Sequence, residues 1–344
     1  MRIGILTGGG DCPGLNAAIR GLVLAGTKKY GHEFIGFLDG WAGPLENRTM
    51  PLDVDTVRDI YDEGGTILGS SRTNPLKDPS SVDKIKANLE ANRIDVLVAI
   101  GGDDTLGVAT KLAEMGVNTV GVPKTIDNDL SATDFTPGFD TAVTIATEAV
   151  DRLHTTARSH HRTLVAEVMG RHSGWIALHT GIAGGADYTM LPEQETKLAD
   201  LCASVQNEYG EGRKNYAIVV VSEGAKLVQE EELVLQDESR DAFGHVKLGG
   251  IGRMVAQLIE RETGIETRSV MLGHTQRGGS PTARDRVLST RYGVFAAEMV
   301  HEGKFGQMAA IRGDTLIAVP LAEATTVNKR VGSELFPVLE VLKS

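Results

Sequence analysis

The sequence predicts an α/β protein built from open, mostly parallel sheets with helices on both faces. Short runs of apolar, β-branched residues alternate along the chain with amphipathic helical patterns, which is the signature of consecutive βαβ units. Several of these runs end in a polar turn that contains glycine, as parallel strands do where they lead into a helix. The chain has 344 residues, which is enough for two domains of about 150 to 200 residues each.

The expected strands are short runs rich in Val, Ile and Leu. The run at 94–100 is apolar almost throughout, which is typical of a strand buried on both faces of a parallel sheet. The segment 64–72 is also interpreted as a strand, because glycines bracket its apolar residues. In chain order, the predicted strands are 2–7, 34–38, 64–72, 94–100, 119–122, 163–168, 217–221 and 268–272.

Helices are expected where apolar residues recur at a spacing of three or four. Val82, Ile85 and Leu89 follow this spacing, with lysines and acids between them. Another predicted helix begins at Leu15, and the remaining ones cover 108–115, 142–157, 249–263 and 288–299. The buried stripe of the last helix is predicted to consist of Leu288, Tyr292, Phe295 and Met299. The polar, acidic segment 225–248 interrupts the pattern and is expected to form a surface excursion.

Composition and charge exclude several classes of protein. Apolar residues make up 41% of the chain and charged residues 24%, which is typical of a folded globular protein and not of a disordered one. With 35 Lys and Arg against 46 Asp and Glu, the formal net charge is −11. Such a chain has no general attraction to nucleic acid or to an anionic membrane. An anionic ligand must therefore be held by individually placed cations.

The cysteines and the N-terminal segment indicate a cytoplasmic location. Cys12 and Cys202 have no metal-ligand spacing and cannot form a disulfide framework, so we expect free thiols in a reducing compartment. No apolar run approaches the roughly 20 residues that span a bilayer. Residues 1–7 have the pattern of a first strand and not of a signal peptide.

Two polar turns, at 99–105 and 123–129, follow neighbouring apolar runs. Ligands of open α/β sheets bind at the carboxyl ends of the strands, so we expect these two turns to face one crevice. Their charged side chains are those of Asp103, Asp104, Lys124, Asp127 and Asp129. Carboxylates of this kind can hold Mg²⁺ or accept a proton.

A third turn, at 8–14, joins the first predicted strand to the helix that begins at Leu15. Its N–H groups and the helix dipole could cradle a phosphate, although a tight turn without a ligand explains this turn equally well. Arginines are also predicted near other strand ends, at Arg72, Arg171 and Arg277. Phosphoryl transfer needs glycine turns that bind phosphate, carboxylates that hold Mg²⁺ and arginines that neutralise the phosphate charge. The sequence contains all three, and together they indicate this reaction. The alternative is that such loops are simply ordinary strand-to-helix connections.

Five segments resemble the 6-phosphofructokinase family and occur in the family's order. They are 7–16, 101–105, 123–129, 169–175 and 272–279. The resemblance covers roughly residues 1–325 and is strongest to the pyrophosphate-dependent members of actinobacterial type.

The resemblance implies an enzyme with two open, mostly parallel three-layer α/β domains and an active site in the cleft between them. Residues 1–138 with 276–326 would bind the phosphoryl donor and Mg²⁺. Residues 139–275 with 327–344 would bind fructose 6-phosphate. The implied reaction moves a phosphoryl group to the 1-hydroxyl of fructose 6-phosphate, as a step of glycolysis or gluconeogenesis.

Matching positions in the family imply roles for individual residues. Asp127 would be the base, Asp103 the Mg²⁺-linked acid, and Arg171 would steady the charge of the moving phosphoryl group. The implied catalytic set is Asp127, Lys124, Thr125, Asp129 and Arg171. The implied donor-binding set is Gly10, Arg72, Gly102, Asp103, Asp104 and Thr105. The implied sugar-phosphate set is Thr125, Asp127, Arg162, Met169, Gly170, Arg171, Glu223, Arg268, His274 and Arg277.

The family also implies a homo-oligomer. In relatives, the arginines that match Arg162 and Arg268 reach into the active site of the adjacent subunit. A homodimer or a homotetramer with shared active sites is therefore expected.

The identity of the phosphoryl donor depends mainly on Asp104. Relatives that use ATP carry glycine there, and a carboxylate would place a negative charge against the α-phosphate of the nucleotide. Two unit charges 4 Å apart repel by about 4 kcal/mol at the effective dielectric of a protein surface. Lys124 offers a cation to a pyrophosphate leaving group. We therefore predict pyrophosphate as the donor in a reversible reaction, with an ATP-dependent enzyme and a non-catalytic sugar-phosphate-binding subunit as alternatives.

Overall fold

The computed structural model of the chain describes residues 1–229, 232–233, 249–324 and 326–343. The chain forms two compact units. One consists of Met1–Thr141 with Arg277–Asn328, and the other of Ala142–Gln276 with Lys329–Ser344. The chain therefore crosses from one unit to the other three times.

The first unit is built on a seven-stranded sheet with the order β14-β13-β5-β4-β1-β2-β3. The strands are β1 (Arg2–Thr7), β2 (Glu33–Phe37), β3 (Thr49–Leu52), β4 (Val96–Gly101), β5 (Thr119–Pro123), β13 (Gln307–Arg312) and β14 (Thr315–Pro320). The five central strands are parallel, and the edge strands β3 and β14 are antiparallel to their neighbours. Every residue of β4 is buried, as its continuous apolar run predicts.

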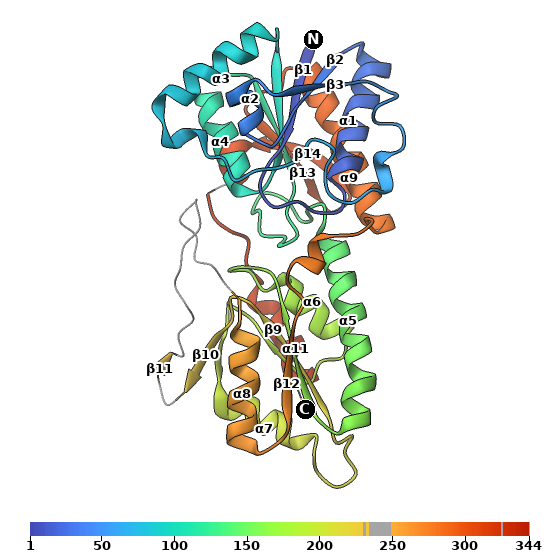
Figure 1. The fold of residues 1–344 in the computed structure, drawn as a ribbon, viewed down its shortest axis with the longest axis vertical. Helices are drawn as coiled ribbons and strands as arrows, with labels where there is room; N and C mark the ends of the chain where they lie inside the picture. The colour runs from blue at the N-terminus through green and yellow to red at the C-terminus, as the bar shows by residue number, and fades with distance from the viewer. Residues whose placement is uncertain (230–231, 234–248, 325, 344) are drawn as a thin grey trace. The chain divides into compact units, whose positions relative to one another are not determined.

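Helices cover both faces of this sheet. They are α1 (Leu15–Tyr30), α2 (Ala42–Glu46), α3 (Pro79–Ala91), α4 (Asp103–Glu114), α9 (Ala283–His301) and α10 (Leu321–Ala324). Figure 1 shows α3 and α4 on one side of the sheet and α1 and α9 on the other. Gly293 lets α9 lie close to α1, because a Cβ there would come within 2.1 Å of the Ala18 carbonyl oxygen. Of the predicted stripe of α9, Leu288, Tyr292 and Met299 are buried, whereas Phe295 is half-buried.

The second unit contains a four-stranded parallel sheet with the order β12-β6-β9-β7 and a small sheet with the order β11-β10-β8. The strands are β6 (Thr163–Val168), β7 (Tyr188–Met190), β8 (Glu195–Lys197), β9 (Ala217–Ser222), β10 (Lys226–Gln229), β11 (Glu232–Leu233) and β12 (Thr267–Met271). The helices are α5 (Phe139–His160), which starts in the first unit, α6 (Trp175–Ala183), α7 (Leu198–Asn207), α8 (Ile251–Thr263) and α11 (Phe336–Leu342). Figure 1 shows α7 and α8 on one side of the larger sheet and α5 and α6 on the other.

The prediction of a strand at 64–72 is wrong. These residues form turns and extended loop, because Gly65 and Gly69 have φ values of 65° and 66°, which no strand allows. Their backbone groups are satisfied locally and by side chains: the Gly69 N–H donates to the Thr66 carbonyl, and the Ile67 N–H donates to Asn16 Oδ1. Apolar residues between glycines thus resemble a strand in sequence, although the hydrogen bonds belong to a loop.

Other elements were not predicted from the sequence, and one segment is only partly described. Among the unpredicted elements are the edge strands β3 and β14, whose residues are mostly half-buried or exposed and therefore show no clear apolar pattern. Of the acidic segment predicted as a surface excursion, 226–229 and 232–233 form β10 and β11. Residues 230–231 and 234–248 lie outside the described part of the chain.

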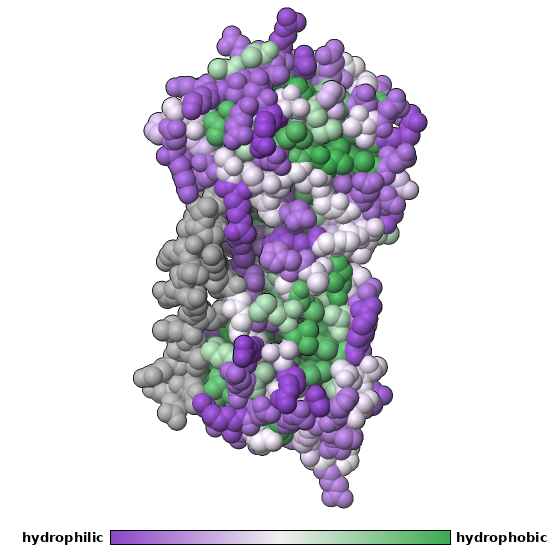
Figure 2. Space-filling model, viewed as in Figure 1, coloured by the Kyte–Doolittle hydropathy of each residue, from purple (hydrophilic) through white to green (hydrophobic). Residues whose placement is uncertain are grey.

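The surface matches the acidic, globular composition. Figure 2 shows hydrophilic residues over much of the visible face of each unit, with apolar residues between them. Among the residues that the structure describes, none of the helices combines the length and apolar character that a membrane crossing requires.

The buried carboxylate of Glu167 in β6 caps α8. Its two oxygens accept hydrogen bonds from the N–H of Gly250, at 2.9 and 3.1 Å, and Oε2 also accepts one from Gly252, at 2.8 Å. Glu167 is 3% exposed, so these N–H groups satisfy a carboxylate that has little access to water. An acid at a helix N-terminus also interacts favourably with the helix dipole.

Replacing Glu167 by Gln is expected to lower the free energy of unfolding by about 2 kcal/mol. The amide group would direct N–H donors at the N–H groups of the helix. Urea denaturation of the variant measures this loss, with Glu262→Gln at the exposed other end of α8 as the matched control. A loss no larger than that of the control would show that the cap contributes nothing to stability.

Candidate functional site

Three polar turns of the first unit lie at one edge of its sheet. The strands β1, β4 and β5 are adjacent and parallel, with Thr7 opposite Ile100 and Gly101 opposite Pro123. The turns that follow them therefore start side by side, as the sequence predicts. Backbone hydrogen bonds continue past the strand ends: the Gly8 N–H donates to the Ile100 carbonyl, at 3.0 Å.

Thr105 lies buried beneath two of these turns. A Cβ at Gly8 would come within 2.6 Å of Thr105 Oγ1, and a Cβ at Gly101 would come within 2.4 Å of Thr105 Cβ. Both positions therefore need glycine, because the threonine side chain fills the space that a larger residue would take. The Thr105 side chain thus packs against both turns.

The turn at 8–11 is held through its carbonyl groups, which accept hydrogen bonds from three side chains. Lys124 Nζ donates to the carbonyls of Gly8, at 2.9 Å, and Gly10. Ser70 Oγ donates to the carbonyl of Gly9.

Arg277 completes this set, because its Nη1 donates to the Asp11 carbonyl at 3.2 Å. Arg277 was expected in the sugar-phosphate set. Within the first unit it lies against the turn at 8–11, which we call the glycine-rich turn. A Cβ at Gly10 would come within 2.7 Å of Arg277 Nη1.

Burial shifts the pKa values of Lys124 and Cys12 in opposite directions. The Lys124 side chain is 2% exposed, and this desolvation lowers the pKa of its ammonium group, while the nearby Asp127 carboxylate acts to raise it. Cys12 is fully buried, donates to the Pro137 carbonyl at 3.3 Å, and burial raises the pKa of its thiol to about 12. Cys12 is therefore a protonated packing residue and not a nucleophile.

The turn that carries Asp127 is fixed by neighbouring hydroxyl groups. Thr125 Oγ1 accepts a hydrogen bond from the Asp127 N–H at 3.0 Å, and Thr136 Oγ1 donates to the Thr125 carbonyl at 2.7 Å. Asn128 takes a left-handed conformation with φ of 52°. Asp127 and Asp129, on either side of it, are only 4% and 8% exposed. The backbone that carries both carboxylates is thus fixed near the end of β5.

The carboxylates of the first unit suit a Mg²⁺ ion that binds together with phosphate. Asp103 and Asp104 form the first turn of α4, after Gly102, and Asp127 and Asp129 follow the neighbouring strand. Among the described residues, no three acidic, His or Cys side chains cluster closely enough to enclose a metal ion by themselves. Mg²⁺ commonly takes only one or two protein carboxylates and fills its other positions with phosphate oxygens and water. The donor set therefore fits Mg²⁺ bound with a phosphorylated ligand.

In the second unit, the turn after β6 carries Met169, Gly170 and Arg171. Glu223, which follows the adjacent strand β9, accepts hydrogen bonds through Oε1 from the N–H groups of Gly170, at 3.3 Å, and Arg171, at 3.0 Å. Gly170 and Arg171 have φ values of 142° and 50°, so the turn is sharp and places Arg171 in a left-handed conformation. These four predicted residues therefore lie together.

Gln276 supports the same turn from the 3₁₀ segment Gly273–Arg277, although the sequence analysis assigned it no role. Its side chain is fully buried, and Oε1 accepts a hydrogen bond from the Met169 N–H at 2.9 Å. The only signal in the sequence was its place inside the segment 272–279. His274, two residues earlier, is exposed in the short 3₁₀ segment Gly273–Arg277.

Arg162 and Arg268 lie at the other end of these strands. Arg162 directly precedes β6, and Arg268 is the second residue of β12, whereas Arg171 and His274 follow the ends of β6 and β12. Both arginines contact one carboxylate: their Nη2 atoms are 3.3 and 3.0 Å from Glu266 Oε1. Within one chain, the second unit does not bring these two arginines together with Arg171.

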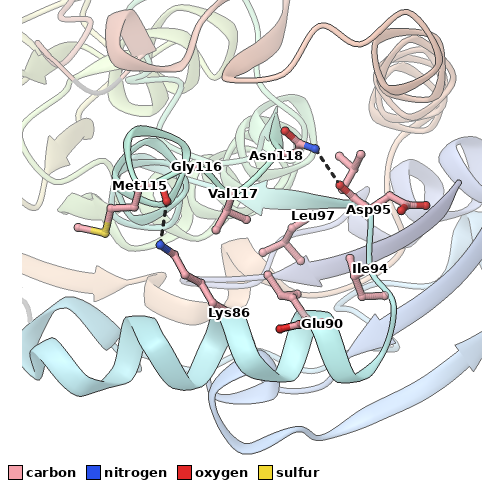
Figure 3. Close-up of a pocket in the computed structure, with 11 residues that line it drawn as sticks. Lys86, Glu90, Ile94, Asp95, Leu97, Met115, Gly116, Val117 and Asn118 are labelled. Atoms are coloured by element: carbon pink, nitrogen blue, oxygen red, sulfur yellow. Dashed lines mark hydrogen bonds between the residues drawn. The ribbon is translucent and has the colours of Figure 1, made fainter.

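A hollow of about 360 Å³ in the first unit lies away from the polar turns (Figure 3). It is lined by α3, the start of β4 and the loop 115–118, where Lys86 Nζ donates to the Met115 carbonyl at 2.8 Å. Since Gly101 and Asp103 lie at the opposite end of β4, this hollow is separate from the candidate site.

Comparison with known proteins shows the family of the chain. Residues 2–300 match the family described as Phosphofructokinase. The pyrophosphate--fructose 6-phosphate 1-phosphotransferase of Streptomyces coelicolor is 58% identical over 98% of both chains. The ATP-dependent 6-phosphofructokinase of Corynebacterium efficiens is 49% identical over 97% of this chain and 96% of its own.

A solved structure, the pyrophosphate-dependent phosphofructokinase from Marinobacter aquaeolei, matches all of this chain and 92% of its own with a TM-score of 0.82. At 21% identity, this likeness concerns the fold. The family match covers most of the chain, and the relatives match it nearly from end to end. The chain belongs to the phosphofructokinase family.

Proposed function

We propose that this chain transfers a phosphoryl group from pyrophosphate to the 1-hydroxyl of fructose 6-phosphate, giving fructose 1,6-bisphosphate and phosphate. The observation that carries the choice of donor is Asp104 in the first turn of α4, which follows β4, the strand adjacent to β1. The relative from Streptomyces coelicolor, which bears the name of this activity, supports the proposal. The reaction runs in both directions, so it serves glycolysis and gluconeogenesis in the cytoplasm.

In this proposal, the first unit holds the donor. The N–H groups of the turn at 8–11 and the N-terminus of α4 bind phosphate oxygens, and Arg72 neutralises their charge. Mg²⁺, bound with the donor and held by Asp103 with support from Asp129, would neutralise charge on the phosphates. Lys124 adds a positive charge directly beneath the glycine-rich turn.

The chemical step needs one proton acceptor. The 1-hydroxyl oxygen of the sugar attacks the terminal phosphorus, a new P–O bond forms, and the P–O bond to the leaving phosphate breaks. Asp127 accepts the hydroxyl proton, and Thr125 donates a hydrogen bond to the moving phosphoryl group. Arg171 stabilises the charge that develops on that group.

The second unit binds the sugar phosphate through Met169, Gly170, Glu223 and His274. Since Arg162 and Arg268 lie at the far end of β6 and β12 from Arg171, they cannot serve the same site within one chain. This separation supports a homodimer or homotetramer in which both arginines complete the site of an adjacent subunit.

An ATP-dependent activity is the second candidate, because the relative from Corynebacterium efficiens, named as ATP-dependent, is 49% identical over nearly the full length. Asp104 argues against it, since a carboxylate there would repel the α-phosphate of a nucleotide.

Purified enzyme is expected to phosphorylate fructose 6-phosphate with pyrophosphate at least about a hundredfold more efficiently, in kcat/KM, than with ATP. The measurement is a coupled assay of fructose 1,6-bisphosphate formation with each donor at saturating Mg²⁺. The reverse assay, with fructose 1,6-bisphosphate and phosphate, is expected to show comparable turnover. Activity with ATP and none with pyrophosphate would replace the proposal by the ATP-dependent alternative.

A further inference from the structure

Two hydrogen bonds join the loop at 69–72 to the end of β1 and to the glycine-rich turn that follows it. Thr7 Oγ1, at the end of β1, donates to the Gly69 carbonyl at 2.8 Å. In the opposite direction, Ser70 Oγ donates to the Gly9 carbonyl. The loop itself is anchored by Leu68, which is fully buried and whose carbonyl accepts a hydrogen bond from the Asp39 N–H at 2.8 Å. The Ser70 hydroxyl is therefore presented to the turn from a fixed position.

The peptide between Gly9 and Gly10 needs such a contact. Glycines on both sides give it freedom to rotate, and Gly9 has φ of 77°, in the left-handed region. In a trans peptide the C=O and N–H groups point in opposite directions. A hydrogen bond that holds the Gly9 carbonyl on the side of Ser70 therefore turns the Gly10 N–H away from Ser70.

The neighbouring peptides are restrained by a different side chain. Lys124 Nζ binds the carbonyls of Gly8 and Gly10 but not that of Gly9. Among the described residues, the side chain that restrains the Gly9–Gly10 peptide is consequently Ser70, through its hydrogen bond to the Gly9 carbonyl. Successive N–H groups held in one orientation form a concavity that binds anions.

We propose that Ser70 is a positioning residue for the phosphoryl donor: its hydroxyl orients the Gly9–Gly10 peptide so that the Gly10 N–H faces a donor phosphate. This inference rests on the proposed function, in which Gly10 binds the donor. In this role, Ser70 acts through the peptide and not by contact with the phosphates. It also sets the loop that carries Arg72, two residues further on, against the same turn.

The test compares Ser70→Thr with Ser70→Val, which have the same shape and differ in the hydroxyl. The Val variant is expected to raise the KM for the donor about tenfold, since the restraint is one hydrogen bond, while the KM for fructose 6-phosphate changes by less than about twofold. The Thr variant is expected to restore a donor KM close to that of the wild type. Calorimetric titration with imidodiphosphate, a non-hydrolysable pyrophosphate analogue, is expected to show the same tenfold difference in Kd.

Ser71→Ala is the matched control, because the Ser71 hydroxyl donates to the Asp39 carbonyl, at 2.7 Å, and not to the glycine-rich turn. Equal donor KM and Kd values for the Val and Thr variants would overturn the proposal, as would an equal rise in both substrate KM values. If Ser70→Val does not fold, as circular dichroism will show, Ser70→Ala takes its place with the same expectation.

The donor KM values are measured with whichever donor the wild-type enzyme accepts. If the wild type uses only ATP, the proposed donor is refuted, but the role of Ser70 is still tested. In that case ATP replaces the pyrophosphate analogue in the titration.

Discussion

Asp127→Asn is expected to lower kcat by more than about a hundredfold while leaving the affinity for fructose 6-phosphate within about threefold of the wild type. Asparagine has the size of aspartate but cannot accept the proton of the sugar hydroxyl. The backbone position of residue 127 is held by Thr125 Oγ1 through the main-chain N–H, so the substitution does not remove that restraint. Steady-state kinetics give kcat, and calorimetric titration gives the Kd for fructose 6-phosphate.

The matched control is Asp83→Asn, which makes the same chemical change at an exposed position of α3. It is expected to leave both kcat and the Kd unchanged. A kcat for Asp127→Asn within about threefold of the wild type would exclude Asp127 as the base. Retained sugar-phosphate binding together with lost turnover would also exclude the non-catalytic, binding-subunit alternative, since the wild type turns over and a pure binding protein needs no proton acceptor.

Asp104→Gly is expected to raise kcat/KM for ATP by about a hundredfold or more. The substitution removes a charge that would repel the α-phosphate by about 4 kcal/mol at 4 Å, and it also opens space for the nucleotide. The use of pyrophosphate is expected to change much less, because pyrophosphate places no third phosphate or nucleoside at that position. Parallel assays with both donors give the ratio of the two kcat/KM values.

Asp104→Asn separates charge from volume in this experiment. It removes the charge but keeps the size, so an ATP gain similar to that of Asp104→Gly assigns the selectivity to electrostatics. A gain confined to the glycine variant assigns it to space. If neither variant improves the use of ATP, Asp104 does not select the donor. A small loss of stability, of about 0.3 to 1 kcal/mol, is expected in both variants, because an acid in the first turn of a helix interacts favourably with the helix dipole.

Strands with long apolar runs could be located from the sequence because burial on both faces leaves a direct trace in residue type. The run 94–100 predicts β4 (Val96–Gly101) within two residues, and 163–168 coincides with β6. The same reasoning failed at 64–72, because glycines with positive φ and apolar residues in a loop give a similar pattern. Edge strands such as β3 and β14 are half exposed and leave little apolar signal.

The sequence by itself was sufficient to place the polar turns at the carboxyl ends of neighbouring strands. Through the resemblance, it also led to the roles that we propose for Asp103, Asp127 and Arg171. Residue type and spacing along the chain carry that information. Only the tertiary structure showed that Lys124 and Ser70 hold the carbonyls of the glycine-rich turn and that Gln276 supports the turn of Arg171.

Only the tertiary structure, likewise, showed that Arg162 and Arg268 both contact Glu266 Oε1. Lys124 and Ser70 lie more than fifty residues from the turn that they hold, and Gln276 lies 107 residues from Met169. Periodicity along a chain reports which side of an element is buried. It does not report which partner a side chain meets there, because that is decided by the packing of distant elements against one another.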